Sequence, residues 1–126
     1  MIAYSIVAGQ LSEKIDRCIV STDSQEIADI AKTYGADVPF LRPSEFATDS
    51  STDIEYIKHA IDWFDENEGY VPEYWVLLRP TTPLREPKVI DKAIEEMINH
   101  LEATSLISIH EFAETPGKMF GMQDGF

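Results

Sequence analysis

The chain has 126 residues, 44% of them hydrophobic, which suits one domain with enough apolar residues for a core. Its formal net charge of −13 repels nucleic-acid backbones and anionic membranes, so neither is an expected partner. The single cysteine, Cys18, excludes a disulfide within the chain. Residues 1–4 show no signal-peptide start and no apolar run is long enough to span a membrane, so we expect a cytoplasmic protein.

The first half of the sequence predicts helices that alternate with strands. Apolar spacing predicts an opening helix (Ile2, Ile6 and Val7), and residues 17–20 read as a strand. A helix is expected next, with Asp23 and Glu26 at capping-box spacing and Gly35 as its stop. Its predicted apolar face consists of Ile27, Ile30, Ala31 and Tyr34. Residues 38–41 are a second predicted strand.

The second half continues the alternation after a polar loop, residues 42–51. A helix is expected from Thr52, which forms a capping box with Glu55, to the stop at residues 67–69. Its predicted buried face consists of Ile54, Ile57, Ile61 and Phe64. Residues 74–78 read as a third strand. Pro87 suits the first turn of another helix, whose apolar stripe is Ile90, Ala93, Ile94, Met97 and Leu101. Residues 105–109 are a fourth predicted strand.

This alternation predicts an α/β fold with a mainly parallel sheet, formed by residues 1–126 as a single unit. The fold usually opens on a strand that carries the first phosphate-binding turn, whereas this chain opens on a helix. Neither a G-x-G-x-x-G sequence nor a P-loop is present.

The clearest functional signal is the loop at residues 79–85, which follows the predicted strand 74–78. Ligands of open α/β sheets bind beyond the carboxyl ends of strands, and two prolines stiffen this loop. Arg79 and Arg85 lie in it, and Arg42 follows the predicted strand 38–41, so three of the four arginines are expected at this edge. Arginine pairs well with carboxylates and phosphates, which indicates a site for an anionic small molecule. Pairing with the many surface carboxylates explains the same arginines equally well.

Other candidates are weaker. The hydroxyls of residues 21–24 could bind phosphate or ribose, but helix capping by Asp23 and turn hydrogen bonds explain them better. The loop at residues 42–53 could surround a base and ribose, or be a solvated loop with a cap at Thr52. His59 is expected on the surface, and His110 is the one histidine placed to meet a ligand. The histidines and Cys18 lack the spacing of a zinc site, so no metal ligand is predicted.

Four segments together resemble the acylneuraminate cytidylyltransferases, or CMP-sialic acid synthetases: residues 20–28, 34–43, 47–49 and 77–85. Their order and spacing match over most of the chain. The resemblance implies a Rossmann-like nucleotidyltransferase that uses CTP and a sialic-acid-like (nonulosonic) sugar acid to form a CMP-sugar and pyrophosphate. It also implies Mg²⁺ as cofactor and a homo-oligomer.

Carried over by residue, the resemblance assigns Arg42 to the nucleotide base. Asp53, with Thr52 beside it, falls at the ribose, where the family often has a serine. Arg79 falls where many members have a glutamine near the sugar, and an arginine there favours a carboxylate. Thr81, Thr82 and Arg85 match the rest of the substrate loop. No catalytic residue is assigned.

The family's opening strand, its glycine-rich triphosphate loop and its late metal-binding aspartates are not found in these residues. We therefore expect a partial cytidylyltransferase domain that lacks the first strand and the C-terminal part, has little transferase activity alone and covers its open sheet edge by forming an oligomer. The alternatives are a non-catalytic α/β module that acts in assembly or partner binding, and a sugar-nucleotide transferase that uses another nucleotide.

Overall fold

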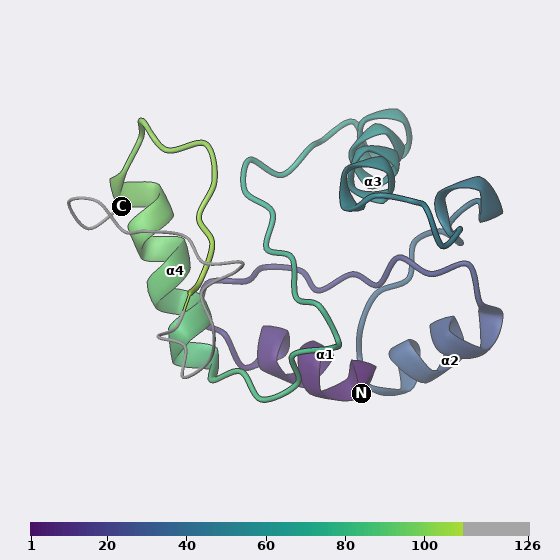
Figure 1. Cartoon of the computed structure of the whole chain (residues 1–126), viewed down its shortest axis with the longest axis horizontal. Helices are drawn as coiled ribbons and strands as arrows, with labels where there is room; N and C mark the ends of the chain where they lie inside the picture. Colours follow the sequence, from purple (N-terminus) through teal and green to yellow (C-terminus); the bar gives the residue numbers. More distant parts are fainter. Residues whose placement is uncertain (110–126) are drawn as a thin grey trace.

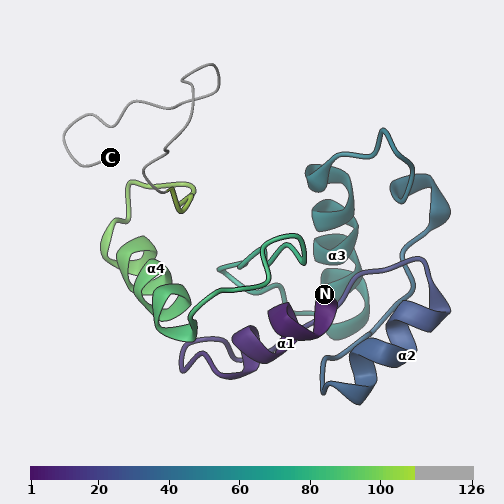
Figure 2. The same cartoon turned by 60° about the horizontal axis from the view of Figure 1, so that its bottom comes forward.

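The computed structural model describes residues 1–109. Helix α1 (Ile2–Gln10) lies between α2 (Gln25–Thr33) and α4 (Pro87–Asn99), as Figures 1 and 2 show. A short 3₁₀ turn, η1 (Ser44–Phe46), precedes α3 (Asp53–Glu68), which lies on the other side of the molecule. The four predicted α-helices are thus confirmed. None of the helices in residues 1–109 is both long and apolar enough to cross a membrane.

Side chains beyond the end of α1 attach it to α4. The buried Ser12 hydroxyl donates a hydrogen bond to the Asp91 carboxylate, and this bond is the main cause of the lowered pKa of Asp91. Lys14 pairs with Glu95 one turn later, with 3.0 Å between Nζ and Oε1. The α1–α4 contact therefore depends on polar partners as well as on the buried Ile90.

The core between α1 and α2 is built from small residues. Ile6, Ala31 and Ala36 are buried together, with Ala31 0% exposed. Partly buried side chains that pack on this cluster are Ile2, Cys18, Val20 and Val38. The predicted apolar face of α2 is wrong in part, because Ala28 is buried whereas Ile27, Ile30 and Tyr34 are each at least 40% exposed. Alanines allow the helix backbone to approach α1 closely, and this contact sets the face that is buried.

The N-cap of α2 lies one residue later than predicted. Ser24, not Asp23, is the N-cap, and its Oγ accepts a hydrogen bond from the Ile27 N–H at 3.3 Å. The Thr22 hydroxyl accepts from the Ser24 N–H at 3.2 Å, which confirms the predicted turn hydrogen bond. The helix ends at Thr33, two residues before Gly35, whose φ of +82° lies in the left-handed region.

Gly35→Ala is expected to destabilise the fold by roughly 1–2 kcal/mol, because a left-handed backbone costs an L-residue about that much. A Cβ at this position would also lie 2.6 Å from Gln10 Nε2, which donates to the Tyr34 carbonyl at 2.9 Å. Urea denaturation of both proteins measures the difference. Gly35→Asn is the control, since asparagine tolerates this conformation better. An alanine variant as stable as the wild type would contradict the assigned backbone.

Helix α3 is capped as predicted, by Thr52 at its start and by Gly69 at its end, and the φ of Gly69 is +63°. Its buried face is shorter than predicted. Ala60 and Phe64 are buried, but Ile54 is 74% exposed. Leu101, predicted as part of the α4 stripe, follows the end of that helix and is exposed.

The predicted strands are not confirmed in residues 1–109. Residues 17–20, 38–41, 74–78 and 105–109 contain no strand, and the one ladder element is an isolated parallel bridge between Ile19 and Asp37. In it the Asp37 N–H donates to the Cys18 carbonyl and the Val20 N–H to the Asp37 carbonyl, both at 2.9 Å. A strand needs a neighbour to form main-chain hydrogen bonds, and residues 74–78 make none to another segment of residues 1–109. The mainly parallel sheet is therefore not confirmed in this part of the chain.

Candidate functional site

Arg42 is held by the turn that precedes α2. Its main-chain N–H donates to the Thr22 carbonyl at 2.8 Å. Its guanidinium donates through Nε to Ser21 Oγ at 3.1 Å and through Nη2 to the Ser21 carbonyl. The same guanidinium lies over the Tyr56 ring, 4.5 Å from the ring centroid, at a distance typical of a cation–π contact. The structure thus brings Arg42 and the hydroxyl-rich residues 21–24 together.

Arg79 is connected to Arg42 through Asp53 and Tyr56. Its Nη2 pairs with Asp53 Oδ2, and the Tyr56 hydroxyl donates to Asp53 Oδ1 at 2.7 Å. Burial is the main cause of the raised pKa of Tyr56, while the charge of Arg42 acts in the opposite direction. A continuous chain of contacts therefore joins Arg42, Tyr56, Asp53 and Arg79, and we call these four residues the arginine network.

Tyr56 was missed by the sequence analysis. It lies three residues after Asp53 on α3, where the two side chains are neighbours on one helix face. That spacing, combined with the predicted role of Asp53, was the available signal.

The loop at residues 79–85 turns around the Arg79 carbonyl. This oxygen accepts from the Thr82 N–H at 3.2 Å, from Arg85 Nη1 at 3.2 Å and from the Ser5 hydroxyl of α1 at 3.4 Å. The side chains of Thr81 and Thr82 are exposed, and Arg85 is half-buried. Among the described residues no carboxylate pairs with Arg85, so its charge is available to an anion near this loop.

Thr52 caps α3. The Glu55 carboxylate Oε2 accepts from its N–H at 2.6 Å and from its hydroxyl at 3.0 Å. Asp53 is likewise occupied, by Arg79 and Tyr56. The proposed ribose contacts of Thr52 and Asp53 remain predictions, and each would require a ligand to replace an existing partner.

Two hydrogen bonds from Thr52 lower the pKa of Glu55. The bond from the main-chain N–H has the larger effect, and the bond from the hydroxyl has the smaller one. A carboxyl group whose pKa is lowered in the folded state stabilises the fold at pH values above its unfolded-state pKa, which is about 4.3 for glutamate. This contribution is lost as the pH falls through the folded-state pKa. We expect Glu55→Gln to reduce stability at about pH 7 and to matter less at about pH 3. Thermal denaturation at both pH values measures this. Glu66→Gln, exposed on the same helix, is the control, and an equal effect of Glu55→Gln at both pH values would contradict the cap.

The loop that carries Arg42 is anchored by aromatic rings. His59 lies between Phe40 and Phe46, with ring centroids 4.8 and 5.6 Å away, and Phe40 also contacts Trp63 at 5.4 Å. The expected surface position of His59 is wrong in part, because the side chain is half-buried and its Nδ1 is buried without a hydrogen-bond partner in the described residues. The other end of the loop closes through the Thr48 and Ser51 hydroxyls, 2.8 Å apart.

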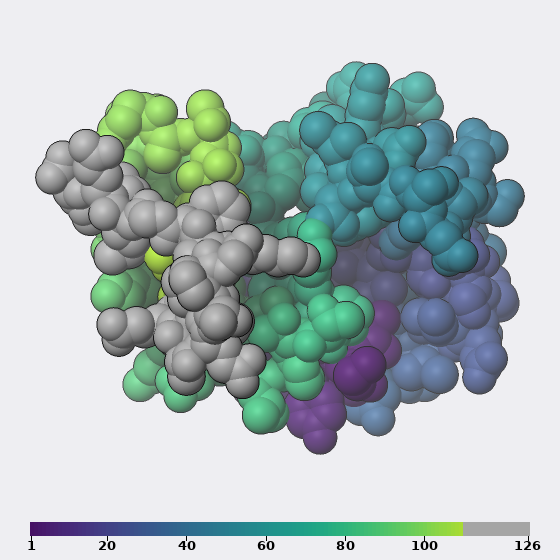
Figure 3. Space-filling view, in the orientation of Figure 1, coloured from purple at the N-terminus to yellow at the C-terminus, as the bar shows by residue number. Residues whose placement is uncertain are grey.

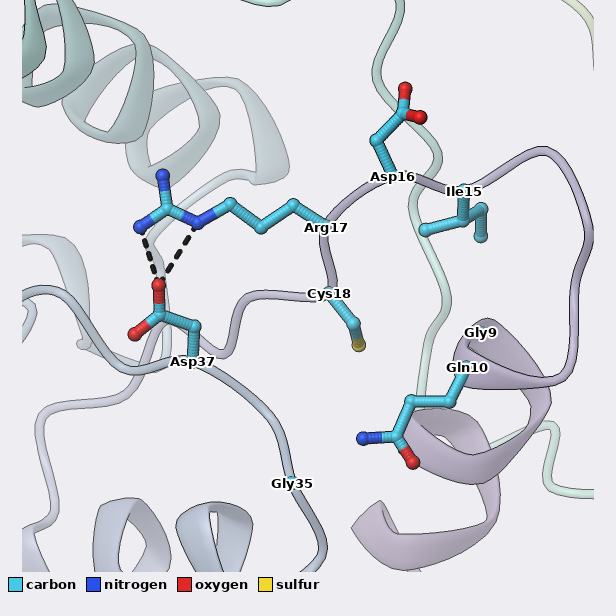
Figure 4. A pocket seen from close by; sticks show the side chains of 8 residues that line it. All are labelled: Gly9, Gln10, Ile15, Asp16, Arg17, Cys18, Gly35 and Asp37. Atoms are coloured by element: carbon cyan, nitrogen blue, oxygen red, sulfur yellow. Dashed lines mark hydrogen bonds and ion pairs between the residues drawn. The ribbon is translucent and has the colours of Figure 1, made fainter.

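A separate pocket of about 330 Å³ lies near α1 and residues 15–18 (Figure 4). Arg17 pairs there with Asp37, and on its other side with Glu68, with 2.8 Å between Nη1 and Oε2. Both pairings raise the pKa of Arg17, and the hydrogen bond to Glu68 has a larger effect than the one to Asp37. Arg17 is thus paired with two carboxylates, and the described residues that line this pocket offer no other arginine or lysine. Among the three loop arginines, Arg79 fits the alternative reading, because it pairs with Asp53.

The arginine network is the better candidate site, because it joins Arg42 to Arg79 through Tyr56 and Asp53, and Arg85 is bonded to the Arg79 carbonyl. No group of three or more His, Cys, Asp or Glu residues in positions 1–109 could hold a metal ion. His110 lies outside the described residues.

Comparison with known proteins adds an independent finding. A cytidylyltransferase family matches residues 1–120. The chain is 36% identical over 116 residues to a CMP-N,N'-diacetyllegionaminic acid synthase of Legionella pneumophila, which covers 92% of this chain and 49% of the relative. It is 40% identical over 95 residues to an N-acylneuraminate cytidylyltransferase of Escherichia coli (75% and 21%) and 28% identical over 112 residues to a pseudaminic acid cytidylyltransferase of Campylobacter jejuni (89% and 47%). The chain spans about half the length of the Legionella and Campylobacter relatives and a smaller part of the Escherichia coli relative.

Proposed function

Because this chain belongs to the cytidylyltransferase family, we propose that it forms part of an enzyme that transfers CMP from CTP to a sialic-acid-like (nonulosonic) sugar acid. The names of the three relatives support this, since each joins a CMP or cytidylyl group to a sugar acid. The structural observation that carries the proposal is the arginine network, which connects the loop expected at the base with the loop expected at the sugar. The same names favour an enzyme over a non-catalytic module.

In the proposed reaction, a hydroxyl oxygen of the sugar acid forms a bond to the α-phosphorus of CTP. The bond from that phosphorus to the bridging oxygen breaks, pyrophosphate leaves, and the hydroxyl proton passes to solvent. Such reactions depend on positioning and charge stabilisation more than on a protein nucleophile. Arg42 would orient the base, and Arg79 and Arg85 the sugar carboxylate.

Mg²⁺ is the proposed cofactor, and it supplies charge neutralisation at the phosphates in this type of chemistry. Residues 1–109 contain no cluster suited to hold it, so we assign no step to an ion bound by them. A cytoplasmic location and a homo-oligomer belong to the same proposal.

Arg79→Ala is expected to raise the KM for the sugar acid by about tenfold or more, and the KM for CTP much less, in an enzyme that includes this chain. The reason is that a charged hydrogen-bond donor contributes about 1.5–3 kcal/mol to holding an anion. Steady-state kinetics with each substrate varied in turn measure the two constants. Lys88→Ala, an exposed cation at the start of α4, is the control. Equal increases in both KM values would contradict the assignment.

The overall proposal is tested by pyrophosphate release from CTP and Mg²⁺ with a panel of nonulosonic acids, together with calorimetric titration of CTP, UTP and ATP. We expect the chain alone to bind CTP weakly and to turn over far below one per second, a usual enzyme rate. Preference for another nucleotide would redirect the proposal to a different sugar-nucleotide transferase. Absence of any nucleotide binding would favour the non-catalytic module.

A further inference from the structure

Arg79 has a different kind of partner from the other three arginines. Among the described residues, Arg17 is paired with two carboxylates. Arg42 and Arg85 donate to hydroxyl and carbonyl oxygens, which carry no net charge. Arg79 pairs with one carboxylate, that of Asp53. The cation expected at the sugar therefore already has an anionic partner before any ligand binds.

The pair between Arg79 and Asp53 is exposed to solvent. The Arg79 side chain is 59% exposed and that of Asp53 is 40% exposed. Because water screens exposed ion pairs, they contribute little to the stability of a fold. The pair can therefore open at little cost to the rest of the molecule.

The main chain of Arg79 is fixed although its side chain is exposed. Its carbonyl accepts hydrogen bonds from the Thr82 N–H, the Arg85 guanidinium and the Ser5 hydroxyl. Figure 3 shows the green chain near residue 80 at the surface, beside the purple α1 to which Ser5 belongs. Opening of the pair thus requires rotation of the Arg79 side chain, while the loop stays in place.

Asp53 keeps its position when Arg79 leaves. The Tyr56 hydroxyl donates to Asp53 Oδ1 at 2.7 Å, whereas Arg79 pairs with Oδ2. The Tyr56 ring is half-buried and has the Arg42 guanidinium 4.5 Å from its centroid, which limits its movement. Asp53 also lies in the first turn of α3, where a negative charge is favourable. The carboxylate therefore stays within reach of Arg79 and returns to it once a ligand departs.

A carboxylate ligand and Asp53 compete for the same guanidinium. Each offers two oxygens to the planar set of N–H donors, and the two negative charges repel each other. A neutral ligand gains no charge pairing from Arg79 and has no charge for Asp53 to repel. The Asp53 carboxylate thus sets how tightly Arg79 binds an anion.

We propose that Asp53 is an intramolecular competitor, which occupies Arg79 in the ligand-free chain and is displaced by the carboxylate of the sugar acid. Tyr56 is the positioning residue that holds Asp53 within reach. The identity of the ligand rests on the proposed function. In that reaction CMP is joined to a hydroxyl of the sugar acid, so the product keeps the carboxylate, and the return of Asp53 to Arg79 promotes its release.

The test is an NMR titration of the purified chain with N-acetylneuraminate. It is followed through the Arg79 Nε–H signal, which is assigned by its absence from the spectrum of Arg79→Ala. We expect Asp53→Asn to bind the acid about three- to fivefold more tightly than the wild type, because it removes an exposed ion pair and a repelling charge. Equal or weaker binding by Asp53→Asn, or no binding at all, would overturn the proposal.

Two controls separate competition between charges from other effects. The methyl ester of the acid carries no negative charge, so its affinity for Asp53→Asn should stay within about 1.5-fold of the wild-type value. Asp62→Asn makes the same change in net charge at an exposed position of α3 and should leave the affinity for the acid within about 1.5-fold. A gain for the ester, or in Asp62→Asn, as large as that for the acid in Asp53→Asn would contradict the competition.

Tyr56→Phe is expected to act in the opposite direction. Without the hydroxyl, Arg79 is the remaining side-chain partner of Asp53 in the described residues, and a ligand that displaces it leaves the carboxylate to water. The acid should then bind about twofold more weakly. In the Asp53→Asn background the same change should have no further effect, because Arg79 has no carboxylate to release. An equal effect in both backgrounds would overturn the positioning role of Tyr56.

The titrations need neither CTP nor pyrophosphate release, so they are read separately from the proposed function. The expected affinities without any transfer activity would support the competition and overturn the function. Transfer activity with an unchanged acid affinity in Asp53→Asn would overturn the competition alone. If Asp53→Asn weakened CTP binding and left the acid affinity unchanged, Asp53 would serve the ribose, and the competition would be overturned as well.

Discussion

Phe64→Ala is expected to lower the free energy of unfolding by about 3–5 kcal/mol, the usual range for truncation of a buried phenylalanine. Phe64 is 2% exposed, and its ring contacts Trp63 and Trp75 with centroids 5.5 and 5.6 Å away. The guanidinium of Arg17 lies over the same ring. One side chain thus holds α3 against the segments that carry Arg17 and Trp75, and its loss leaves a cavity between them. Urea denaturation followed by tryptophan fluorescence measures the change.

Ile54→Ala on the same helix is the matched control. Ile54 is 74% exposed, so its truncation should change stability by no more than about 0.5 kcal/mol. Since whole domains are stable by only about 5–15 kcal/mol, the Phe64 variant should be close to unfolded at room temperature. A loss of less than about 1 kcal/mol would mean that α3 is not held at this point.

Arg42→Ala is expected to weaken CTP binding by about tenfold to hundredfold. A charged hydrogen-bond donor contributes about 1.5–3 kcal/mol, and a tenfold change in affinity corresponds to about 1.4 kcal/mol. Its bonds to Ser21 and its position over Tyr56 hold the guanidinium in one place, so little freedom is lost when a ligand binds. Calorimetric titration of CTP measures the affinity.

Two variants separate position from charge. Lys58→Ala removes one exposed cation from α3 and should leave CTP affinity within about twofold of the wild type. Arg42→Lys keeps the charge but loses the planar donor geometry, so an intermediate affinity is expected. If Arg42→Ala bound CTP as tightly as the wild type, the base would have to be held elsewhere.

The helices were predictable because their signals are local. Pro87 begins α4, Gly69 ends α3 and Thr52 caps it, and each of these effects depends on residues only a few positions apart. The buried face of α2 was less predictable. Its exposed Ile27 and Ile30 are more apolar than the alanines that α1 contacts, and hydrophobicity alone does not show how closely two helices approach.

The strand predictions were not confirmed for a different reason. Residues 74–78 have the composition of a buried strand, but a ladder requires a partner that no property of the segment itself supplies. In the site, the sequence placed Arg42 and Arg79 at one edge by their positions after predicted strands, and the family resemblance added Asp53 at the ribose. It did not reveal that Asp53 pairs with Arg79, because that contact joins residues 26 positions apart.

The Asp53 carboxylate divides its two oxygens between Arg79 and the Tyr56 hydroxyl, whose ring also supports Arg42. A ligand that draws Arg79 away therefore changes the charge that Tyr56 and Arg42 experience. Thermodynamic linkage requires that any such effect be reciprocal: if a sugar acid alters nucleotide affinity by a given factor, the nucleotide alters sugar-acid affinity by the same factor. Asp53 would thus couple the two proposed ligands even if only one of them changes its contacts.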